Sequence, residues 1–254
     1  MTASAYDVDP SIHITSGRLT TRCSSLAETL CGADNFKAAN CSTRPFGVSL
    51  DKQSMSTHLS QLPPDLPRPV DDGAAAHLEG AFLPDVALPS TDGTSVHLSD
   101  LRGRWVIYIY PMTGRPDVPL PDGWDGIPGA RGCTPQSCRF RDQYKELAEL
   151  GASIFGLSAQ TTDYQREVRD RLHLPFQLLS DSSLQLKGTL RLPMFTVGSM
   201  ELFKRLTLIA EDGRIKKVFY PVFPPDRNAD DVLAYLRSDA QPGAAGDAPK
   251  AARP

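Results

Sequence analysis

Several features that mark whole classes of protein are missing from this sequence. No apolar run approaches the roughly 18 residues that a membrane-spanning helix needs. A net charge of −3 argues against the basic stripe of a nucleic-acid-binding protein. Neither a glycine-rich phosphate loop nor a Gly-x-Ser-x-Gly sequence is present, which argues against the common nucleotide-binding and serine-hydrolase signatures. Five cysteines in 254 residues are too few for a disulfide scaffold, so we expect a reducing, cytoplasmic setting.

Composition divides the chain into three parts. Residues 1–75 are rich in Ser, Thr, Ala, Asp and Pro, lack sustained periodicity and are expected to form a disordered N-terminal extension. Residues 76–238 have the apolar content of one domain with a real core, and residues 239–254 are expected to form a disordered tail. The beginning of the chain has no apolar segment and is not expected to be a secretory signal.

Three cysteines lie in the extension. The spacings of Cys23, Cys31 and Cys41 match no metal motif, and no histidine cluster accompanies them. We interpret them as incidental thiols and predict neither a metal site nor another cofactor. His97 and His173 are interpreted as structural.

Within the domain, apolar strand patterns alternate with helical ones. Strands are expected at 82–88, 105–110, 152–158, 176–179, 205–210 and 215–220, and helices at 134–150, 162–172 and 230–236. Capping boxes are expected to begin at Thr162 and Ser182. The unbroken apolar run at 105–110 predicts a central strand covered on both faces. The order of elements predicts an α/β fold of three layers with a mixed sheet.

The most informative stretch is Gly132-Cys133-Thr134-Pro135-Gln136-Ser137-Cys138. Thr134 is expected to cap a helix, and Pro135 suits its first position. Cys133 then lies at the helix N-terminus, where unpaired amides and the macrodipole favour an anion and hence a nucleophilic thiolate. Arg131 and Arg139 add positive charge nearby in sequence.

The spacing of Cys133 and Cys138 is the second signal. In an intact helix their α-carbons would lie roughly 8–9 Å apart. A disulfide needs less than about 7 Å, so the two sulfurs can join only if the first turn unwinds. We interpret the pair as a redox switch; the alternative is two unrelated thiols, one of them in the core.

From Leu83 to Leu236 the chain resembles a peroxiredoxin on the thioredoxin fold, most closely the Q-type or bacterioferritin-comigratory subfamily. The resemblance rests on several segments in the right order: Leu83-Pro84-Asp85, Thr91-Asp92-Gly93, Leu98 to Gly103, Tyr110-Pro111, Gly132-Cys133-Thr134 with Cys138, Phe140-Arg141-Asp142, and Leu174 to Asp181. It implies a thioredoxin-like three-layer fold with a central mixed sheet.

The resemblance also implies a reaction. Cys133 would be the peroxidatic cysteine that reduces hydrogen peroxide and organic hydroperoxides, and Cys138 the resolving cysteine that forms a disulfide with it. A thioredoxin- or glutaredoxin-like donor would then reduce the disulfide. No cofactor or nucleic acid is implied, and relatives occur as monomers and homodimers. Arg205, with Lys204 as the alternative, matches the arginine that steadies the thiolate and the peroxide oxygens.

One part of the family pattern is absent. Ala130 stands where the family has an active-site threonine, and Met112 to Arg131 form an apparent insertion. Thr113, Thr134 or backbone amides are the candidates to replace that hydroxyl, and Thr113 is preferred. The insertion is either a lid or a surface loop, and its Trp124 either packs or binds substrate.

Two other functions compete with peroxidase activity. A copper-delivery module on the same fold would need Cys-x3-Cys and a histidine downstream, whereas the spacing here is Cys-x4-Cys. A non-enzymatic redox sensor or thiol chaperone would use the same two cysteines without turnover.

Overall fold

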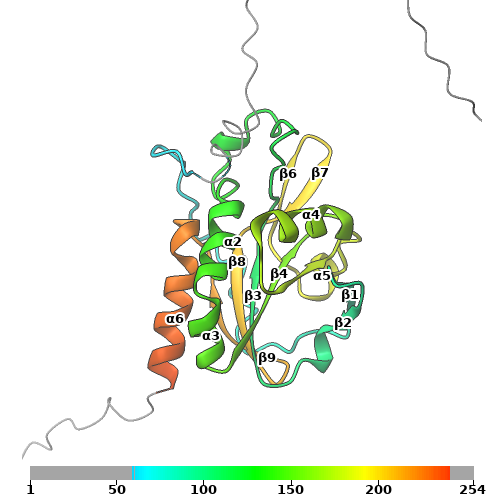
Figure 1. Cartoon of the computed structure of the whole chain (residues 1–254), viewed down its shortest axis with the longest axis vertical. Helices are drawn as coiled ribbons and strands as arrows, with labels where there is room; N and C mark the ends of the chain where they lie inside the picture. Colours follow the sequence, from blue (N-terminus) through cyan, green and yellow to red (C-terminus); the bar gives the residue numbers. More distant parts are fainter. Residues whose placement is uncertain (1–58, 60, 241–254) are drawn as a thin grey trace, which may run out of the picture. The chain divides into compact units, whose positions relative to one another are not determined.

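The computed structural model describes Leu59 and residues 61–240. Five strands form a mixed sheet in the order β5-β4-β3-β8-β9 (Figure 1). Their bounds are β3 Arg104–Ile109, β4 Ala152–Ser158, β5 Gln177–Ser180, β8 Leu206–Glu211 and β9 Arg214–Phe219. β3, β4 and β5 run parallel, whereas β8 pairs antiparallel with both β3 and β9. The predicted mixed sheet is confirmed.

The central strand β3 shows why the run at 105–110 is apolar throughout. Val106 and Tyr108 belong to the core on one face of the sheet, and Ile107 and Ile109 to the core on the other. Because side chains alternate along a strand, a strand covered on both faces has no position for a solvated side chain.

Helices cover the first of these two faces. They are α2 Cys133–Asp142, α3 Tyr144–Glu149, α4 Thr162–Leu172 and α6 Asn228–Asp239. Each contributes apolar side chains to the same core: Phe140 from α2, Leu147 from α3, Val168 from α4 and Val232 from α6. In Figure 1, α2, α3 and α6 lie together beside the sheet.

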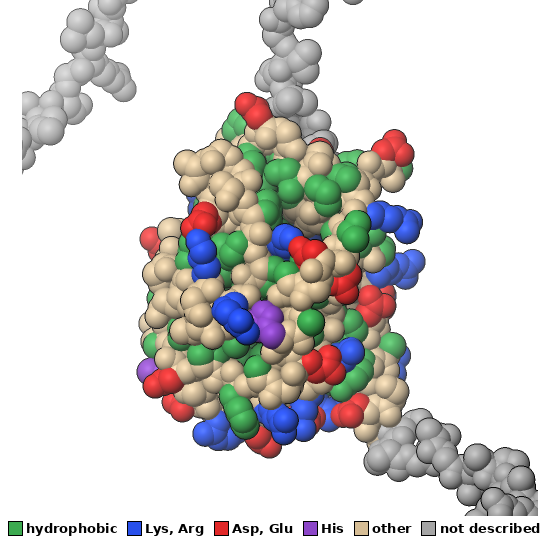
Figure 2. Space-filling model, turned by 180° about the vertical axis from the view of Figure 1, so that it is seen from behind, with side chains coloured by type: hydrophobic (Ala, Val, Ile, Leu, Met, Phe, Trp, Pro, Cys, Tyr) green, Lys and Arg blue, Asp and Glu red, His purple; other side chains and the backbone are tan. Residues whose placement is uncertain are grey.

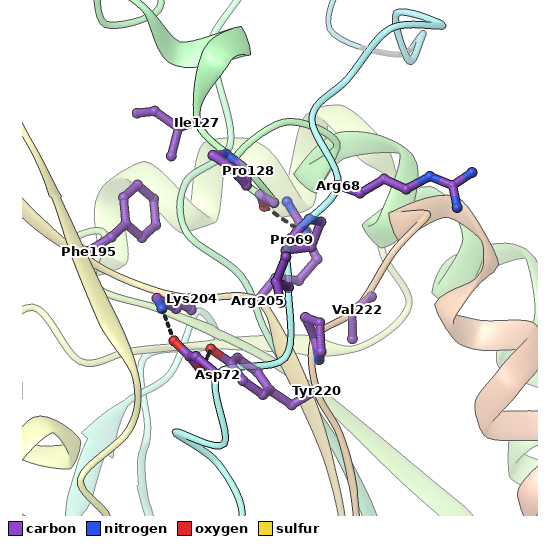
Figure 3. A pocket seen from close by; sticks show the side chains of 13 residues that line it. Arg68, Pro69, Asp72, Ile127, Pro128, Phe195, Lys204, Arg205, Tyr220 and Val222 are labelled. Carbon is purple, nitrogen blue, oxygen red and sulfur yellow. Dashed lines mark hydrogen bonds and ion pairs between the residues drawn. The ribbon is translucent and has the colours of Figure 1, made fainter.

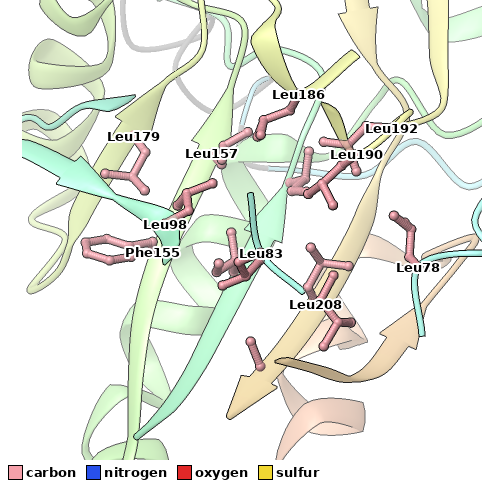
Figure 4. Close-up of a cluster of buried hydrophobic side chains, with 14 of the residues drawn as sticks. Leu78, Leu83, Leu98, Phe155, Leu157, Leu179, Leu186, Leu190, Leu192 and Leu208 are labelled. Atoms are coloured by element: carbon pink, nitrogen blue, oxygen red, sulfur yellow. The ribbon is translucent and has the colours of Figure 1, made fainter. Parts of the chain in front are cut away.

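Short segments cover the opposite face. They include the hairpin of β1 (Ala87–Pro89) and β2 (Ser95–His97), the 3₁₀ turn η1 (Leu98–Asp100) and the helix α5 (Gln185–Thr189). Leucines dominate this core, among them Leu78, Leu83, Leu98, Leu186 and Leu208 (Figure 4).

A second hairpin was not predicted from the sequence. It joins β6 (Met194–Val197) to β7 (Met200–Phe203) and packs against the insertion at 112–131. The insertion contains a 3₁₀ turn, η2 (Trp124–Gly126), and another such turn, η3 (Pro225–Arg227), precedes α6. Trp124 is buried in a small core with Val197 and Leu202. The insertion therefore folds against the domain.

Several element boundaries differ from the predictions. The strand expected at 82–88 is only β1, and the helix expected at 134–150 is divided into α2 and α3 around Gln143. Thr161 rather than Thr162 caps α4, because its hydroxyl accepts from the amide of Tyr164 at 3.4 Å. The side chain of Asp181, rather than that of Ser182, binds the first amides of α5.

The carboxylate of Asp181 explains why Ser182 does not cap α5. It accepts hydrogen bonds from the amides of Gln185 and Leu186, at 2.8 and 2.9 Å. An aspartate already bound to these amides leaves no role for a serine cap at the next position.

The described part of the N-terminal extension contacts the domain well before the predicted boundary at residue 76. The carboxylate of Asp72 accepts from Lys204 Nζ at 2.6 Å and from the Tyr220 hydroxyl at 2.7 Å. Leu59 is buried, and Leu62 lies close to Gly132. Residues 1–58, 60 and 241–254, which include Cys23, Cys31 and Cys41, lie outside the described residues.

The surface carries charges of both signs. Lys and Arg are interspersed with Asp and Glu over the face seen in Figure 2. Over the described residues, every helix is too short or too polar to cross a bilayer.

We predict that Gly156→Ala destabilises the domain by about 1–3 kcal/mol through overpacking of the core. A Cβ at Gly156 would lie 2.5 Å from Leu178 Cδ2 and 2.6 Å from the buried Tyr108 hydroxyl. Gly188→Ala is the matched control, because a Cβ there meets no atom within 4 Å. Urea unfolding of both variants checks this; equal midpoints would contradict the tight packing of β4 against β3.

Candidate active site

Cys133 is the first residue of α2, so the helix begins one residue earlier than predicted. Gly132, not Thr134, holds the N-cap position and has a φ of 100°, in the left-handed region that glycine adopts without strain. A Cβ at Gly132 would also collide with Pro225 and would lie 2.8 Å from Leu62. Only glycine fits, and it places the Cys133 sulfur at the N-terminal end of the helix.

Arg205 lies directly against the sulfur. Its Nη2 donates to Cys133 Sγ at 3.1 Å, and both side chains are buried, with 3% of each exposed. The thiol in turn lies 3.6 Å from the carbonyl oxygen of Ala130. A buried cation at this distance stabilises an anionic sulfur far more than it would in water.

The remaining donors of Arg205 are held by the surrounding backbone. Nε donates to the carbonyl of Gly129 at 3.3 Å, and Nη2 donates to those of Ala130 and Arg131, both at 3.1 Å. Nη1 donates to the side-chain oxygen of Gln136. These contacts fix the guanidinium in one orientation.

Lys204, the alternative to Arg205, lies elsewhere. Its ammonium is paired with Asp72, as Figure 3 shows. Of the two cations, the structure thus brings only Arg205 to the sulfur.

A narrow cleft lies beside Cys133. Its lining residues are Leu59, Met112, Gly114, Leu120, Trp124, Arg131, Gly132, Cys133 and Thr134. The cleft has a volume of about 10 Å³, room for about one water molecule. A substrate larger than a water molecule therefore needs the lining side chains to move.

The two candidate threonines are placed differently. Thr134 lines the cleft. Thr113 is buried outside its lining, and its hydroxyl donates to Gln160 Oε1 at 3.0 Å. The preference for Thr113 drawn from the sequence finds no support in this arrangement.

Both interpretations of the insertion have some basis in the structure. Trp124 packs near Phe195, with ring centroids 6.2 Å apart, and also lines the cleft. Asp125 in the same turn pairs with Arg131 at 3.2 Å. The insertion is thus packed on the domain and forms one wall at Cys133.

Cys138 is half-buried on the same helix, and both cysteines are free thiols. Burial raises the pKa of the Cys138 thiol, while the nearby Arg141 partly opposes this shift. With both cysteines in the intact α2, the predicted separation of roughly 8–9 Å between their α-carbons applies.

Arg139 does not serve Cys133, contrary to its expected electrostatic role. Its guanidinium pairs with Asp230 of α6 at 2.6 Å, and this contact lowers the pKa of Asp230. Gln143 Nε2 donates to the same carboxylate at 3.0 Å. These bonds join the C-terminal half of α2 to α6.

A larger pocket of about 390 Å³ lies on another side of Arg205 (Figure 3). Ile127, Pro128, Phe195 and Val222 supply apolar walls, and the Lys204–Asp72 pair lies at its base. Cys133 is not among its lining residues.

The two histidines take part in local structure. His97 lies 3.2 Å from Asp85, and His173 ends α4 with a left-handed φ of 52°. Across the described ranges, no three His, Cys, Asp or Glu side chains gather as a metal site would require.

Comparisons with known proteins agree with this geometry. The family model described as Redoxin matches residues 78–233. The chain is 29% identical over 189 residues to a chloroplastic peroxiredoxin Q of Suaeda salsa, covering 74% of this chain and 80% of the relative. A chloroplastic peroxiredoxin Q of Gentiana triflora is 26% identical over 200 residues, covering 75% and 85%.

A solved structure is similar as well. The crystal structure of peroxidoxin BcpB from Mycobacterium tuberculosis is 28% identical, with a TM-score of 0.51. The match covers 63% of this chain and 96% of that one.

The chain belongs to the redoxin family. Within that family it is a peroxiredoxin of the Q or bacterioferritin-comigratory type, with a thioredoxin-like fold, and hence a thiol peroxidase.

Sequence reasoning missed three contributors to this site. Gln136 lies one helical turn after Cys133, and this spacing is the signal that could have found it. Asn228, which receives a hydrogen bond from Gln136, and Leu59, which lines the cleft, come from distant segments and carry no comparable local signal.

We predict that Cys138 in a Cys133→Ser variant reacts slowly with iodoacetamide at neutral pH. Burial raises the pKa of this thiol, so the thiolate fraction is small and the rate should still rise at pH 9. In urea, where burial is lost, the same rate should level off at lower pH. Mass spectrometry of the peptide from Gly132 to Arg139 follows the reaction. A rate that reaches its plateau below pH 8 in the folded protein would contradict a raised pKa of Cys138.

Proposed function

We propose that Cys133 is the peroxidatic cysteine of a thiol peroxidase acting on hydrogen peroxide and organic hydroperoxides. The thiolate attacks the terminal oxygen of the peroxide, so that an S–O bond forms and the O–O bond breaks. The other oxygen leaves with a proton as water or alcohol, and Cys133 becomes a sulfenic acid.

The observation that carries this proposal is the 3.1 Å contact between Arg205 Nη2 and Cys133 Sγ inside the domain. Attack on the peroxide moves negative charge from sulfur to the departing oxygen. A buried guanidinium held by backbone carbonyls can stabilise that charge without reorganising. Cys133, placed at the start of α2, has further stabilisation from the helix N-terminus.

The family's threonine needs a replacement. We propose Thr134, because it lines the cleft beside Cys133 whereas the Thr113 hydroxyl is occupied by Gln160. A hydroxyl that can donate and accept suits a peroxide, whose oxygens do both.

Cys138 then resolves the sulfenic acid. Its sulfur attacks Cys133 Sγ, the S–O bond breaks, and water leaves as the disulfide forms. The first turn of α2 must unwind to bring the sulfurs together. The Arg139–Asp230 ion pair can hold the later part of the helix meanwhile.

A thioredoxin- or glutaredoxin-like dithiol is the proposed reductant. Its thiolate attacks the disulfide, and a second thiol releases the reduced enzyme. This exchange suits the reducing, cytoplasmic setting inferred from the small number of cysteines.

We predict that Cys133→Ser abolishes peroxide consumption, whereas Cys138→Ser reduces one equivalent of peroxide and then stops. Without a resolving thiol, the sulfenic acid has no route to the disulfide that the dithiol reduces. Stopped-flow assays with hydrogen peroxide, thioredoxin and thioredoxin reductase measure both steps. Cys41→Ser, outside the proposed site, should keep full turnover. Steady turnover by Cys133→Ser would contradict the site, and absence of turnover by the unaltered protein would favour a redox sensor.

We also predict that Leu59→Ala accelerates reduction of cumene hydroperoxide more than reduction of hydrogen peroxide. Leu59 is buried in the cleft at Cys133, and burying a leucine contributes roughly 1.5–3 kcal/mol, so removing it should ease opening about tenfold. Val70→Ala is the matched control, since Val70 belongs to the same segment but is 82% exposed. Equal rates for all three proteins would show that Leu59 does not limit access.

A further inference from the structure

Behind Arg205 lies a chain of buried polar side chains that the peroxidase reaction does not use directly. Arg205 Nη1 donates to Gln136 Oε1, and Gln136 Nε2 donates to Asn228 Oδ1 at 2.9 Å. The Thr207 hydroxyl donates to the same oxygen of Asn228 at 2.6 Å. All four side chains are buried, with at most 3% exposed.

The direction of these hydrogen bonds matters. A glutamine side chain has an accepting oxygen on one side and a donating nitrogen on the other, whereas a guanidinium only donates. Gln136 can therefore bind Arg205 only when its oxygen faces the arginine. That orientation turns its nitrogen toward Asn228, where an acceptor must be present.

Thr207 and Asn228 supply that acceptor. With the hydroxyl of Thr207 donating to Asn228 Oδ1, the oxygen of this amide lies where Gln136 Nε2 can also reach it. If the Asn228 amide were reversed, its nitrogen would face Gln136. Gln136 would then have to reverse too, and two donors would meet at Arg205.

Asn228 holds this orientation at a cost. Its Nδ2 is buried and has no hydrogen-bond partner within the described part of the chain. An unmet buried donor costs roughly 1–3 kcal/mol, which an apolar side chain of similar size would avoid. If Asn228 only packed α6 against the core, an apolar side chain of similar size would make the fold more stable.

We infer that Asn228 is a positioning residue for the peroxidase reaction, because it orients the Gln136 carboxamide and thereby holds Arg205 against Cys133. The inference rests on the proposed roles of Cys133 and Arg205. Hydrogen bonds through Gln136 and Arg205 connect Asn228 to the sulfur.

The test compares Asn228→Leu, which removes the acceptor at similar volume, with Asn228→Asp, which keeps it. In a Cys138→Ser background, the pH profile of Cys133 alkylation by iodoacetamide should move to higher pH with Asn228→Leu and much less with Asn228→Asp. The peroxide rate constant should fall about tenfold with Asn228→Leu, the size expected for one lost charge-assisted hydrogen bond.

Other groups near Cys133 should not produce this shift. Arg131 lines the cleft, Cys138 lies on the same helix, and Tyr108 and Tyr110 of the neighbouring strand region stay neutral because burial raises the pKa of each. The hydrogen bonds of Asn228 instead lead through Gln136 to Arg205, so movement of Arg205 is the expected cause of a shift.

A double-mutant cycle separates positioning from a merely structural role. In a Gln136→Glu background, the carboxylate presents an accepting oxygen to Arg205 in either orientation and no longer needs Asn228 to orient it. Asn228→Leu should then cause no further shift in the alkylation profile. An equal shift in both backgrounds would overturn the inference.

Gln165→Leu is the matched control for loss of a buried amide. Gln165 donates to Ser158 and to the carbonyl of Leu179 rather than to Gln136 or Asn228, so the variant should lose stability without moving the profile. If Asn228→Leu does not fold, Thr207→Val replaces it, with a smaller shift expected in the same direction. An unshifted profile in that variant would also overturn the inference.

The experiments distinguish failure of this inference from failure of the proposed function. If Cys133→Ser loses peroxidase activity but Asn228→Leu leaves the profile unchanged, the positioning role is wrong and the peroxidase assignment stands. If the unaltered protein consumes no peroxide, the proposed function is wrong, and a shifted alkylation profile then shows only that Asn228 holds Arg205 against Cys133.

Discussion

The contact between the Arg205 guanidinium and the Cys133 sulfur is the constraint around which the site is built. A cation inside a protein needs partners for every donor, since an unpaired buried charge is very costly. Arg205 finds them in three consecutive backbone carbonyls at the end of the insertion, in Gln136 and in the sulfur itself. One side chain therefore binds β8, the insertion and α2 into a single arrangement.

This arrangement suits the first step of the proposed reaction and opposes the second. In that proposal, attack on peroxide uses an intact helix start, with Gly132 in its left-handed conformation and Gln136 bound to Arg205. The proposed disulfide needs the same turn to unwind, which would separate Gln136 from both Arg205 and Asn228. The stability of that turn would then set how long Cys133 stays in the form proposed to react with peroxide.

Access to the sulfur is limited by the insertion, which lies within the region that the family model matches, and by a residue that precedes this region. Trp124 and Leu120 of the insertion and Leu59 of the N-terminal extension close the cleft to about the size of one water molecule. The packing of Leu59 on the insertion is tight, because a Cβ at Gly114 would lie 2.7 Å from Leu59 Cδ2. Opening and closing of this cover would govern which peroxides reach Cys133.

The sequence by itself determined the features that depend on neighbouring residues. The apolar runs of β3 and β4, the hairpin of β8 and β9 and a helix start within one residue of Cys133 follow from local periodicity, glycine and turn chemistry. Even here single caps were misplaced. Gly132 holds the N-cap position two residues before Thr134, and Thr161 and Asp181 bind helix amides one residue before the predicted Thr162 and Ser182.

Tertiary structure alone decided which distant side chains meet at the sulfur. It placed Arg205 rather than Lys204 at the sulfur, and Thr134 rather than Thr113 in the cleft. It also brought Asn228 and Leu59 to the site from distant parts of the sequence. Lys204 and Arg205 lie in the two-residue connection between β7 and β8, and this connection places Arg205 at the sulfur and Lys204 at Asp72. No local pattern predicts its path, because the hydrogen bonds that position β8 join it to residues of β3 about a hundred positions away.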